Sequence, residues 1–335
     1  MKHEPIAPLI VGRGMAGQAI LKSLAIVSLT DPELNLLPAR FLPREGRLNS
    51  YILEQAENVA FVANPSGLHA RILSEGASAG FGAIVADKPV CVRPEEIPLL
   101  RGIDLPVAVL HGYRAMWGSR TIRDMIDAGE LGEVFCFESR YWQSSSARAA
   151  MEGASGDRPW KNDPRLNGPW DTLTDLGSHV ADICLYLMKD KPLENRCHIS
   201  YRNSGAPHRD THVQLHLRFR DDRSALASIS KTVHGAANNL EYTVLGTKGT
   251  VTWRFWHPDE VVVGSRGKTS ILRREPPNPS SGTVPFHGLG WLEGYVEIIR
   301  QALRRLSGLP CAQVPTLQES LVAMEVLFNA AEHRV

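Results

Sequence analysis

The sequence predicts an α/β fold, in which a doubly wound parallel sheet is followed by a second α/β domain with an open, mostly antiparallel sheet. Short apolar strands alternate with helices as far as residue 114, a pattern typical of parallel sheets with helices on both faces. From residue 115 onward, strand-like segments follow one another with turns between them, which favours an antiparallel sheet. We therefore expect two domains, residues 1–114 and residues 115–335.

A glycine-rich turn separates the first predicted strand from the first predicted helix. Its glycines fit the pattern G-x-G-x-x-G, in which they allow a tight turn, admit a pyrophosphate to the backbone, and let the helix pack closely on the strand. The N–H groups at the helix start also attract phosphate. Such turns occur without ligands too, so a purely structural role stays open. The predicted nucleotide-binding residues of this turn are Gly12, Arg13, Gly14, Met15, Ala16 and Gly17.

The end of the second predicted strand, residues 39–42, bears on the choice between NAD and NADP. In NAD-preferring folds an acidic residue there holds the ribose 2′-hydroxyl, whereas this chain continues with Pro-Arg-Glu-Gly-Arg. Arg44 can hold a 2′-phosphate, which favours NADP. Solvated arginines on a loop explain the same pattern, and Glu45 keeps NAD open.

Polar residues also follow the later strands, at the edge where ligands bind in parallel sheets. Asn64 and Pro65 end one apolar run, Lys88 follows the next, and Tyr113 follows the last. We count Asn64, Pro65 and His69 on the cofactor side, with His69 bracing the turn. The ammonium of Lys88 can bind a substrate hydroxyl and favour its alkoxide. Tyr113 either lines the pocket or packs at the domain junction.

A predicted helix over residues 173–188 carries a second chemical centre. Asp175, His179 and Asp182 are spaced so that they share one helix face. A carboxylate next to an imidazole suits proton abstraction from an alcohol. An acid at a helix start with a hydrogen-bonded core histidine explains the same residues. No further ligand cluster appears, so we expect no metal site.

The irregular segment 143–168 is long for a loop inside a compact domain, and loops of that length are usually functional or disordered. We expect its residues Trp160, Lys161 and Arg165 to cover a substrate.

Composition excludes several classes of protein. The chain has 335 residues and a net charge of +1, so electrostatics favour neither a nucleic-acid partner nor an anionic membrane. Its five scattered cysteines form no C-x-x-C pair, which indicates free thiols in a reducing compartment. The sequence has neither a signal-peptide pattern nor a run of about 20 apolar residues, so we expect a cytoplasmic protein.

Together these motifs resemble those of the Gfo/Idh/MocA family of NAD(P)-dependent oxidoreductases, named after glucose–fructose oxidoreductase and inositol dehydrogenase. The matching segments are the glycine turn, residues 63–69, Asp-Lys-Pro at 87–89, DAGELGEV at 127–134, Asp-Leu-Gly-Ser-His at 175–179, and LGTKGT at 245–250. The resemblance implies a Rossmann domain, an open sheet that makes the contacts of a homodimer or homotetramer, and a cis Lys88–Pro89 bond. It also places the family's lysine at Lys88, its acid/base at His179, and its substrate-holding carboxylate at Asp175. Asp87 departs from the family's usual Glu.

The sequence thus predicts hydride transfer between nicotinamide and the carbinol or carbonyl carbon of a sugar, sugar acid, cyclitol or related polyol. One alternative is an imine or ene reductase, in which His179 would serve as an acid. The other is a regulator that binds nucleotide or sugar without turnover, against which the presence of both Lys88 and His179 argues.

Overall fold

The computed structural model consists of two compact units. It describes residues 4–147, 161, 163–201, 209–275 and 289–333. Unit 1 comprises residues 1–115 and 276–321, and unit 2 comprises residues 116–275 and 322–335. The sequence assigns everything after residue 114 to one second domain, whereas residues 276–321 lie in unit 1.

Unit 1 is built on a parallel sheet of five strands in the order β2-β1-β3-β4-β5. The strands are β1 (Ile6–Val11), β2 (Arg40–Phe41), β3 (Glu57–Val62), β4 (Ala83–Ala86) and β5 (Val107–Val109). All of β1 and all but the first residue of β3 are buried, as expected for strands covered on both faces. Because β2 and β3 lie on opposite sides of β1, the strand order reverses there, and ligands bind at such switch points.

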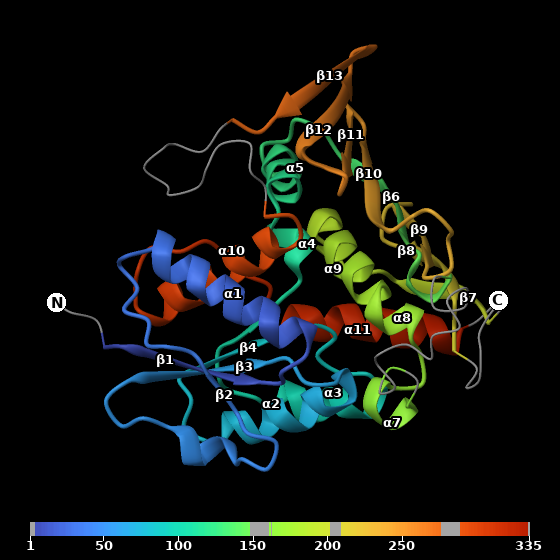
Figure 1. Cartoon of the computed structure of the whole chain (residues 1–335). Coiled ribbons are helices and arrows are strands. Elements are labelled where there is room, and N and C mark those ends of the chain that lie inside the picture. The colour runs from blue at the N-terminus through green and yellow to red at the C-terminus, as the bar shows by residue number, and fades with distance from the viewer. Residues whose placement is uncertain (1–3, 148–160, 162, 202–208, 276–288, 334–335) are drawn as a thin grey trace. The chain divides into compact units, whose positions relative to one another are not determined.

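Helices cover both faces of this sheet, with α1 and α10 on one face and α2 and α3 on the other (Figure 1). Unit 1 contains α1 (Met15–Thr30), η1 (Leu48–Tyr51), η2 (Ser66–Leu68), α2 (His69–Ala77), η3 (Pro94–Glu96), α3 (Ile97–Arg101), α4 (Gly112–Ala115) and α10 (Leu292–Leu306). The helix α10 explains why residues 276–321 return to this unit. Its buried Tyr295, Ile299 and Leu303 belong to the same core as α1, β1 and β3.

One predicted helix of unit 1 is wrong. The sequence predicts a helix over 48–57, but the structure has only the short η1 there. The Asn58 side chain accepts the Leu53 N–H at 3.0 Å and donates to the carbonyls of Leu53 and Ala56, both at 2.9 Å. These bonds occupy backbone groups that a helix would need, so the segment stays irregular.

Unit 2 is built on an eight-stranded sheet in the order β13-β12-β11-β10-β6-β9-β8-β7, in which only β6 and β9 pair in parallel. The strands are β6 (Val134–Gln143), β7 (Glu194–Ser200), β8 (His212–Arg218), β9 (Ser224–Ser230), β10 (Asn238–Gly246), β11 (Thr250–Arg254), β12 (His257–Ser265) and β13 (Lys268–Arg273). Along β8, buried Val213, Leu215 and Leu217 alternate with exposed Gln214 and His216, the pattern of a sheet with one buried face.

The helices described in unit 2 are α5 (Trp117–Asp127), α7 (Pro164–Asn167), α8 (Thr172–Asp175), α9 (Gly177–Met188) and the second part of α11 (Leu317–Glu332), which begins in unit 1. The single helix that the sequence predicts over 173–188 is divided into α8 and α9. Leu176 separates α8 from α9. Its carbonyl accepts the N–H of His179, three residues later, at 3.2 Å, whereas a regular α-helix bonds residues four apart. Gly177, a poor helix former, begins α9.

Candidate functional site

Each glycine of the turn between β1 and α1 has its own structural reason. Gly12 has φ +113°, and a Cβ there would collide with the Ala63 carbonyl at the end of β3. A Cβ on Gly17 would collide with the Gly12 carbonyl, so this glycine lets α1 begin close to the turn. A Cβ on Gly14 would meet no atom within 4 Å, and Gly14 caps α1 without a side-chain hydrogen bond. The open space at this helix start fits the pyrophosphate of a dinucleotide.

We expect Gly14→Ala and Gly17→Ala to separate cofactor binding from folding. Gly14 has φ −72°, which alanine adopts readily, so Gly14→Ala should keep wild-type stability. Its methyl group would occupy the path of the pyrophosphate and weaken dinucleotide binding by about tenfold or more. Gly17→Ala should lower the free energy of unfolding by about 1–3 kcal/mol, because its methyl group overlaps the Gly12 carbonyl. Urea unfolding and fluorescence titration with NADH and NADPH measure the two effects; equal destabilisation would contradict this expectation.

Backbone hydrogen bonds align the carboxyl ends of β1, β3, β4 and β5. In each bond, the first residue beyond one strand donates its N–H to the last residue of the neighbouring strand, at 2.8 Å: Ala63 to Val11, Asp87 to Val62, and Leu110 to Ala86. The glycine turn, Asn64 and Lys88 therefore follow adjacent strand ends at one edge of the sheet, where ligands bind in doubly wound folds.

The segment that carries Lys88 is fixed by its neighbours. The Lys88–Pro89 peptide bond is cis, as the family resemblance implies. Asp87 Oδ1 accepts hydrogen bonds from the Lys88 backbone N–H at 2.9 Å and from the Tyr295 hydroxyl at 2.6 Å. Asp87, whose side chain is shorter than that of the family's usual Glu, thus joins the Lys88 backbone to α10.

His69 connects this segment to the end of β3. It is 1% exposed, and its two ring nitrogens lie 2.7 Å from the Pro89 carbonyl oxygen and 2.8 Å from that of Asn64. Both polar atoms of the ring thus face backbone carbonyls. His69 braces the Asn64–Pro65 turn and holds it against the Lys88–Pro89 segment.

Two arginines lie near the end of β2. The Arg13 guanidinium lies 5.5 Å from the centre of the Phe41 ring, within cation–π range. Arg44 is exposed on the loop that follows β2. At the start of α1, Met15 is 58% exposed and Ala16 is half-buried. This end of the sheet therefore presents cationic side chains next to the glycine turn.

Tyr113, which the sequence places among the substrate-binding residues, is 7% exposed within unit 1. Its neighbour Arg114 is also buried and donates a hydrogen bond to Glu319 Oε1 at 2.7 Å. Burial raises the pKa of Glu319, but the hydrogen bond and charge of Arg114, together with the hydrogen bonds from Thr316, outweigh this effect, and the pKa lies below its usual range. The short helix α4 thus packs tightly inside unit 1.

In unit 2, Asp175 is the last residue of α8 and His179 lies in the first turn of α9. His179 is 9% exposed, and its ring lies edge-on to that of Tyr141 on β6, with the ring centres 5.9 Å apart. The Tyr141 hydroxyl donates to Asn238 Oδ1 at 3.0 Å. Asp182, one turn beyond His179, is 3% exposed. The imidazole therefore has a defined orientation against the sheet.

A buried lysine, absent from the predicted site residues, binds the Asp175 carboxylate. Lys231 follows β9 and is 2% exposed; its ammonium donates to Asp175 Oδ2 at 2.7 Å and to Asp171 Oδ1 at 2.8 Å. Lys161, with a side chain 33% exposed, donates to the same Asp175 oxygen at 3.2 Å. Burial disfavours the charged amine, yet the two carboxylates keep the pKa of Lys231 above its usual range. A lysine in the otherwise uncharged run 225–232 is the signal that could have found it.

The other predicted substrate residues of the 143–168 segment, Trp160 and Arg165, have different outcomes. Trp160 lies outside the described residues. The Arg165 side chain is 88% exposed and pairs locally with Asp163, at 2.8 Å. The structure therefore leaves Arg165 on the surface of unit 2.

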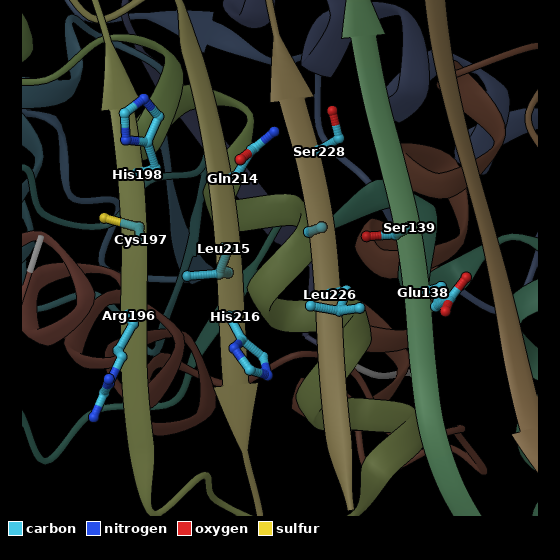
Figure 2. Close-up of a pocket in the computed structure, with 11 residues that line it drawn as sticks. Glu138, Ser139, Arg196, Cys197, His198, Gln214, Leu215, His216, Leu226 and Ser228 are labelled. Atoms are coloured by element: carbon cyan, nitrogen blue, oxygen red, sulfur yellow. The ribbon is translucent and has the colours of Figure 1, made fainter. Parts of the chain in front are cut away.

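A hollow of about 600 Å³ lies on the open face of the unit 2 sheet (Figure 2). Its exposed side chains come from four neighbouring strands: Glu138, Arg196, His198, Gln214, His216 and Leu226. The helix α9 packs through Val180 and Cys184 on buried residues of the same strands, including Leu215. The hollow thus lies on the sheet face opposite α9, and neither Asp175 nor His179 lines it.

The described parts of the chain contain neither a cluster of metal-ligating side chains nor a helix that could span a membrane. Within them, no group of three or more His, Cys, Asp or Glu side chains could hold a metal ion. The helices in those parts include none that is long and apolar enough to cross a membrane.

Unit 1 is thus a doubly wound parallel sheet, and unit 2 is an α/β unit with an open, mostly antiparallel sheet. Residues 119–252 match the model of the GFO/IDH/MocA C-terminal domain. The matched part contains three of the motifs on which the resemblance to the Gfo/Idh/MocA family rests, at residues 127–134, 175–179 and 245–250.

Known proteins similar to this chain include a levoglucosan dehydrogenase of Pseudarthrobacter phenanthrenivorans, 22% identical over 82% of this chain and 77% of that protein. The uncharacterized oxidoreductase YfiI of Bacillus subtilis is 25% identical over 64% of this chain, a match that spans only 56% of YfiI. Among solved structures, an inositol dehydrogenase homologue from Azotobacter vinelandii, complexed with NAD+, has a TM-score of 0.81 at 21% identity, covering 99% of this chain and 97% of that one. Levoglucosan dehydrogenase with NADH and levoglucosan has a TM-score of 0.83 at 18% identity, covering 98% of each chain.

Proposed function

We propose that the protein is an NAD(P)-dependent dehydrogenase or ketoreductase acting on a sugar, sugar acid, cyclitol or related polyol. The observation that carries this proposal is that Asp175 ends α8 and the buried His179 lies in the first turn of α9, within the segment that matches the oxidoreductase family model. The levoglucosan and inositol dehydrogenases named above support the substrate class. The presence of Lys88 in addition to His179 argues against a regulator without turnover.

The residues at the edge of the unit 1 sheet fit a nicotinamide dinucleotide. The open space at Gly14 and the start of α1 would hold the pyrophosphate, with Arg13, Met15 and Ala16 beside it. Asn64, Pro65 and His69 would complete the cofactor side. When bound, the cofactor supplies a hydride acceptor or donor at its nicotinamide ring.

The chain's own residues would move the proton and hold the substrate. In the oxidative direction, His179 accepts the proton of the reacting hydroxyl. The Lys88 ammonium donates a hydrogen bond to a substrate hydroxyl and favours its alkoxide. Asp175 accepts a hydrogen bond from a neighbouring hydroxyl and orients His179. Tyr113 and Arg165 are the further substrate contacts that we propose from the sequence.

For the cofactor, we propose that Arg44 binds a 2′-phosphate and that NADPH is preferred. The support is the exposed Arg44 on the loop after β2 and the lack of an acidic residue at the end of that strand. The solved relatives hold NAD+ or NADH, which makes the comparison of both nucleotides the first experiment.

Titration with NADPH and NADH tests this cofactor preference. We expect Arg44→Ala to weaken NADPH binding by roughly 10- to 100-fold, since a charge-assisted hydrogen bond contributes about 1.5–3 kcal/mol. NADH binding should be unaffected. Arg47→Ala, which removes another exposed arginine of the same loop, is the matched control. Equal affinity of the wild-type protein for both nucleotides would contradict the preference.

Turnover is tested by absorbance at the nicotinamide band with a panel of sugars, sugar acids and cyclitols, and with cyclic imines as the contrasting class. Oxidation of at least one polyol is expected. Activity on imines alone would favour the imine reductase, and nucleotide binding without any turnover would favour the regulator.

We also propose a homodimer or homotetramer assembled through the open face of the unit 2 sheet. The support is the family resemblance together with Leu226, which is 45% exposed on that face. Light scattering in solution measures the assembly, and a monomer would contradict it.

A further inference from the structure

The helix that ends in Asp175 owes its position to the sheet of unit 2. α8 has four residues, too few for a helix to be stable by itself. At the start of β8, the Asp210 carboxylate accepts the N–H of Asp171 and, at 2.7 Å, that of Leu173. The Thr172 hydroxyl donates to the Asp210 carbonyl, also at 2.7 Å. The N-terminal end of α8 is thus bonded to Asp210, two residues before β8.

The backbone just before α8 is held from the same place. Arg209 is 7% exposed and donates to the Gly168 carbonyl at 2.6 Å and to the Trp170 carbonyl at 2.9 Å. Both bonds come from a side chain that is itself buried. The entry into α8 therefore has little freedom to move.

Lys231 reaches α8 from the neighbouring strand and binds both of its ends. Its ammonium, with three donors, bonds Asp171 just before the helix and Asp175 at its last residue. Its backbone N–H donates to the Thr211 carbonyl at 3.2 Å, which ties the end of β9 to the start of β8. The orientation of the Asp175 carboxylate is thus set by a buried cation fixed to the sheet.

We propose that Lys231 is a positioning residue, which holds Asp175 as an oriented carboxylate for the substrate. This role rests on the proposed function, in which Asp175 binds a substrate hydroxyl and orients His179. Lys231 acts through Asp175 and, at 2% exposure, does not contact the substrate itself.

The charges around Lys231 explain why its removal should matter. The groups that face it are Asp171, Asp175 and Asp210, and Lys161 donates to the same Asp175 oxygen as Lys231 does. Burial raises the pKa of Asp210. Two carboxylate oxygens that share one ammonium are necessarily close, so without Lys231 they repel each other. Asp175 would then take up a proton at higher pH and lose its fixed orientation.

The test is steady-state kinetics of Lys231→Met with the polyol that the wild-type protein oxidises. We expect kcat/KM to fall by about 10- to 100-fold, because a small displacement of a positioning group has an effect of this size. The acid limb of the pH profile should move upward by about one pH unit, since the carboxylate loses a nearby cation. The Kd for the preferred nucleotide should not change, because unit 1 provides its predicted binding residues.

Matched variants separate positioning from folding. Lys231→Met with Asp171→Asn removes one charge of each sign, so the double variant should fold even where the single one does not. It should still show the loss in kcat/KM, because Asp175 has lost its buried ammonium partner. Its acid limb should move less than that of the single variant, because Asp171 no longer repels Asp175. Lys161→Met removes the more exposed lysine from the same oxygen and should have a smaller effect. Lys189→Met removes an exposed lysine that pairs with Asp127 and should behave as wild type.

Each outcome decides a separate point. A wild-type protein that turns over no substrate of the panel would overturn the proposed function, and with it the role of Lys231. If the wild-type protein is active and both Lys231 variants keep its kcat/KM and acid limb, only the role of Lys231 fails. A lower kcat/KM with an unmoved acid limb would also overturn it, because a merely structural role has that result.

Discussion

Replacing Lys88 with methionine is expected to lower kcat by about 10²- to 10³-fold, the loss typical when one donor to a developing oxyanion is removed. Methionine keeps the length of the lysine side chain but donates no hydrogen bond. The carbonyl product and the neutral hydroxyl need this donor less than the transition state does, so the loss should fall mainly on kcat.

The scaffold around Lys88 makes this variant interpretable. The Asp87 carboxylate bonds the Lys88 backbone N–H, and Tyr295 and His69 hold the flanking segment through contacts that do not involve the Lys88 ammonium. Nucleotide affinity and the free energy of unfolding should therefore stay close to their wild-type values. Lys22→Met, which removes an exposed lysine of α1, is the control for loss of a positive charge in unit 1. Turnover near the wild-type rate would rule out the role assigned to Lys88.

The edge of the unit 1 sheet was predictable from the sequence because its determinants are local. The spacing of Gly12, Gly14 and Gly17 reports a turn whose contacts lie within a few residues or against the adjacent strand. Apolar runs followed by polar residues mark the strand ends, and parallel pairing then brings those ends to one edge. The cis bond before Pro89 came from the family resemblance, since no local pattern distinguishes it from a trans bond.

The parts that were not predictable depend on contacts between distant residues. Lys231 binds a carboxylate 56 residues earlier in the chain, and a sequence pattern contains no record of that pairing. Residues 276–321 return to unit 1 because α10 contributes apolar residues to its core, a pairing that periodicity alone cannot assign. The division of the helix at Leu176 was not predictable either. Leu176 keeps a right-handed helical backbone, and the change lies in the hydrogen bonding, where the Leu176 carbonyl accepts the N–H three residues later.

Replacing His179 with asparagine is expected to lower kcat by about 10²- to 10⁴-fold, the contribution typical of a general base. Asparagine is of similar size and polar, but it does not take up a proton near neutral pH. His179 is 9% exposed beside Tyr141, so its ring is partly shielded from water and held in one orientation. The imidazole is therefore already oriented before the proton is transferred.

The pH dependence distinguishes a base from a structural histidine. A histidine must be neutral to accept the hydroxyl proton, so oxidation by the wild-type protein should fall as the pH is lowered, and reduction should gain from the protonated form. In His179→Asn this opposite dependence of the two directions should disappear, whereas a structural histidine would change stability and leave the residual pH profile intact. His257→Asn, at an exposed position of β12, is the matched control and should keep both limbs.

Because Asp175 is proposed to act through the same imidazole, combining Asp175→Asn with His179→Asn should add little to the loss from His179→Asn alone, as expected for residues that work as a unit. Fully additive losses would mean that the two side chains serve separate steps, and the carboxylate would then be assigned to substrate binding alone.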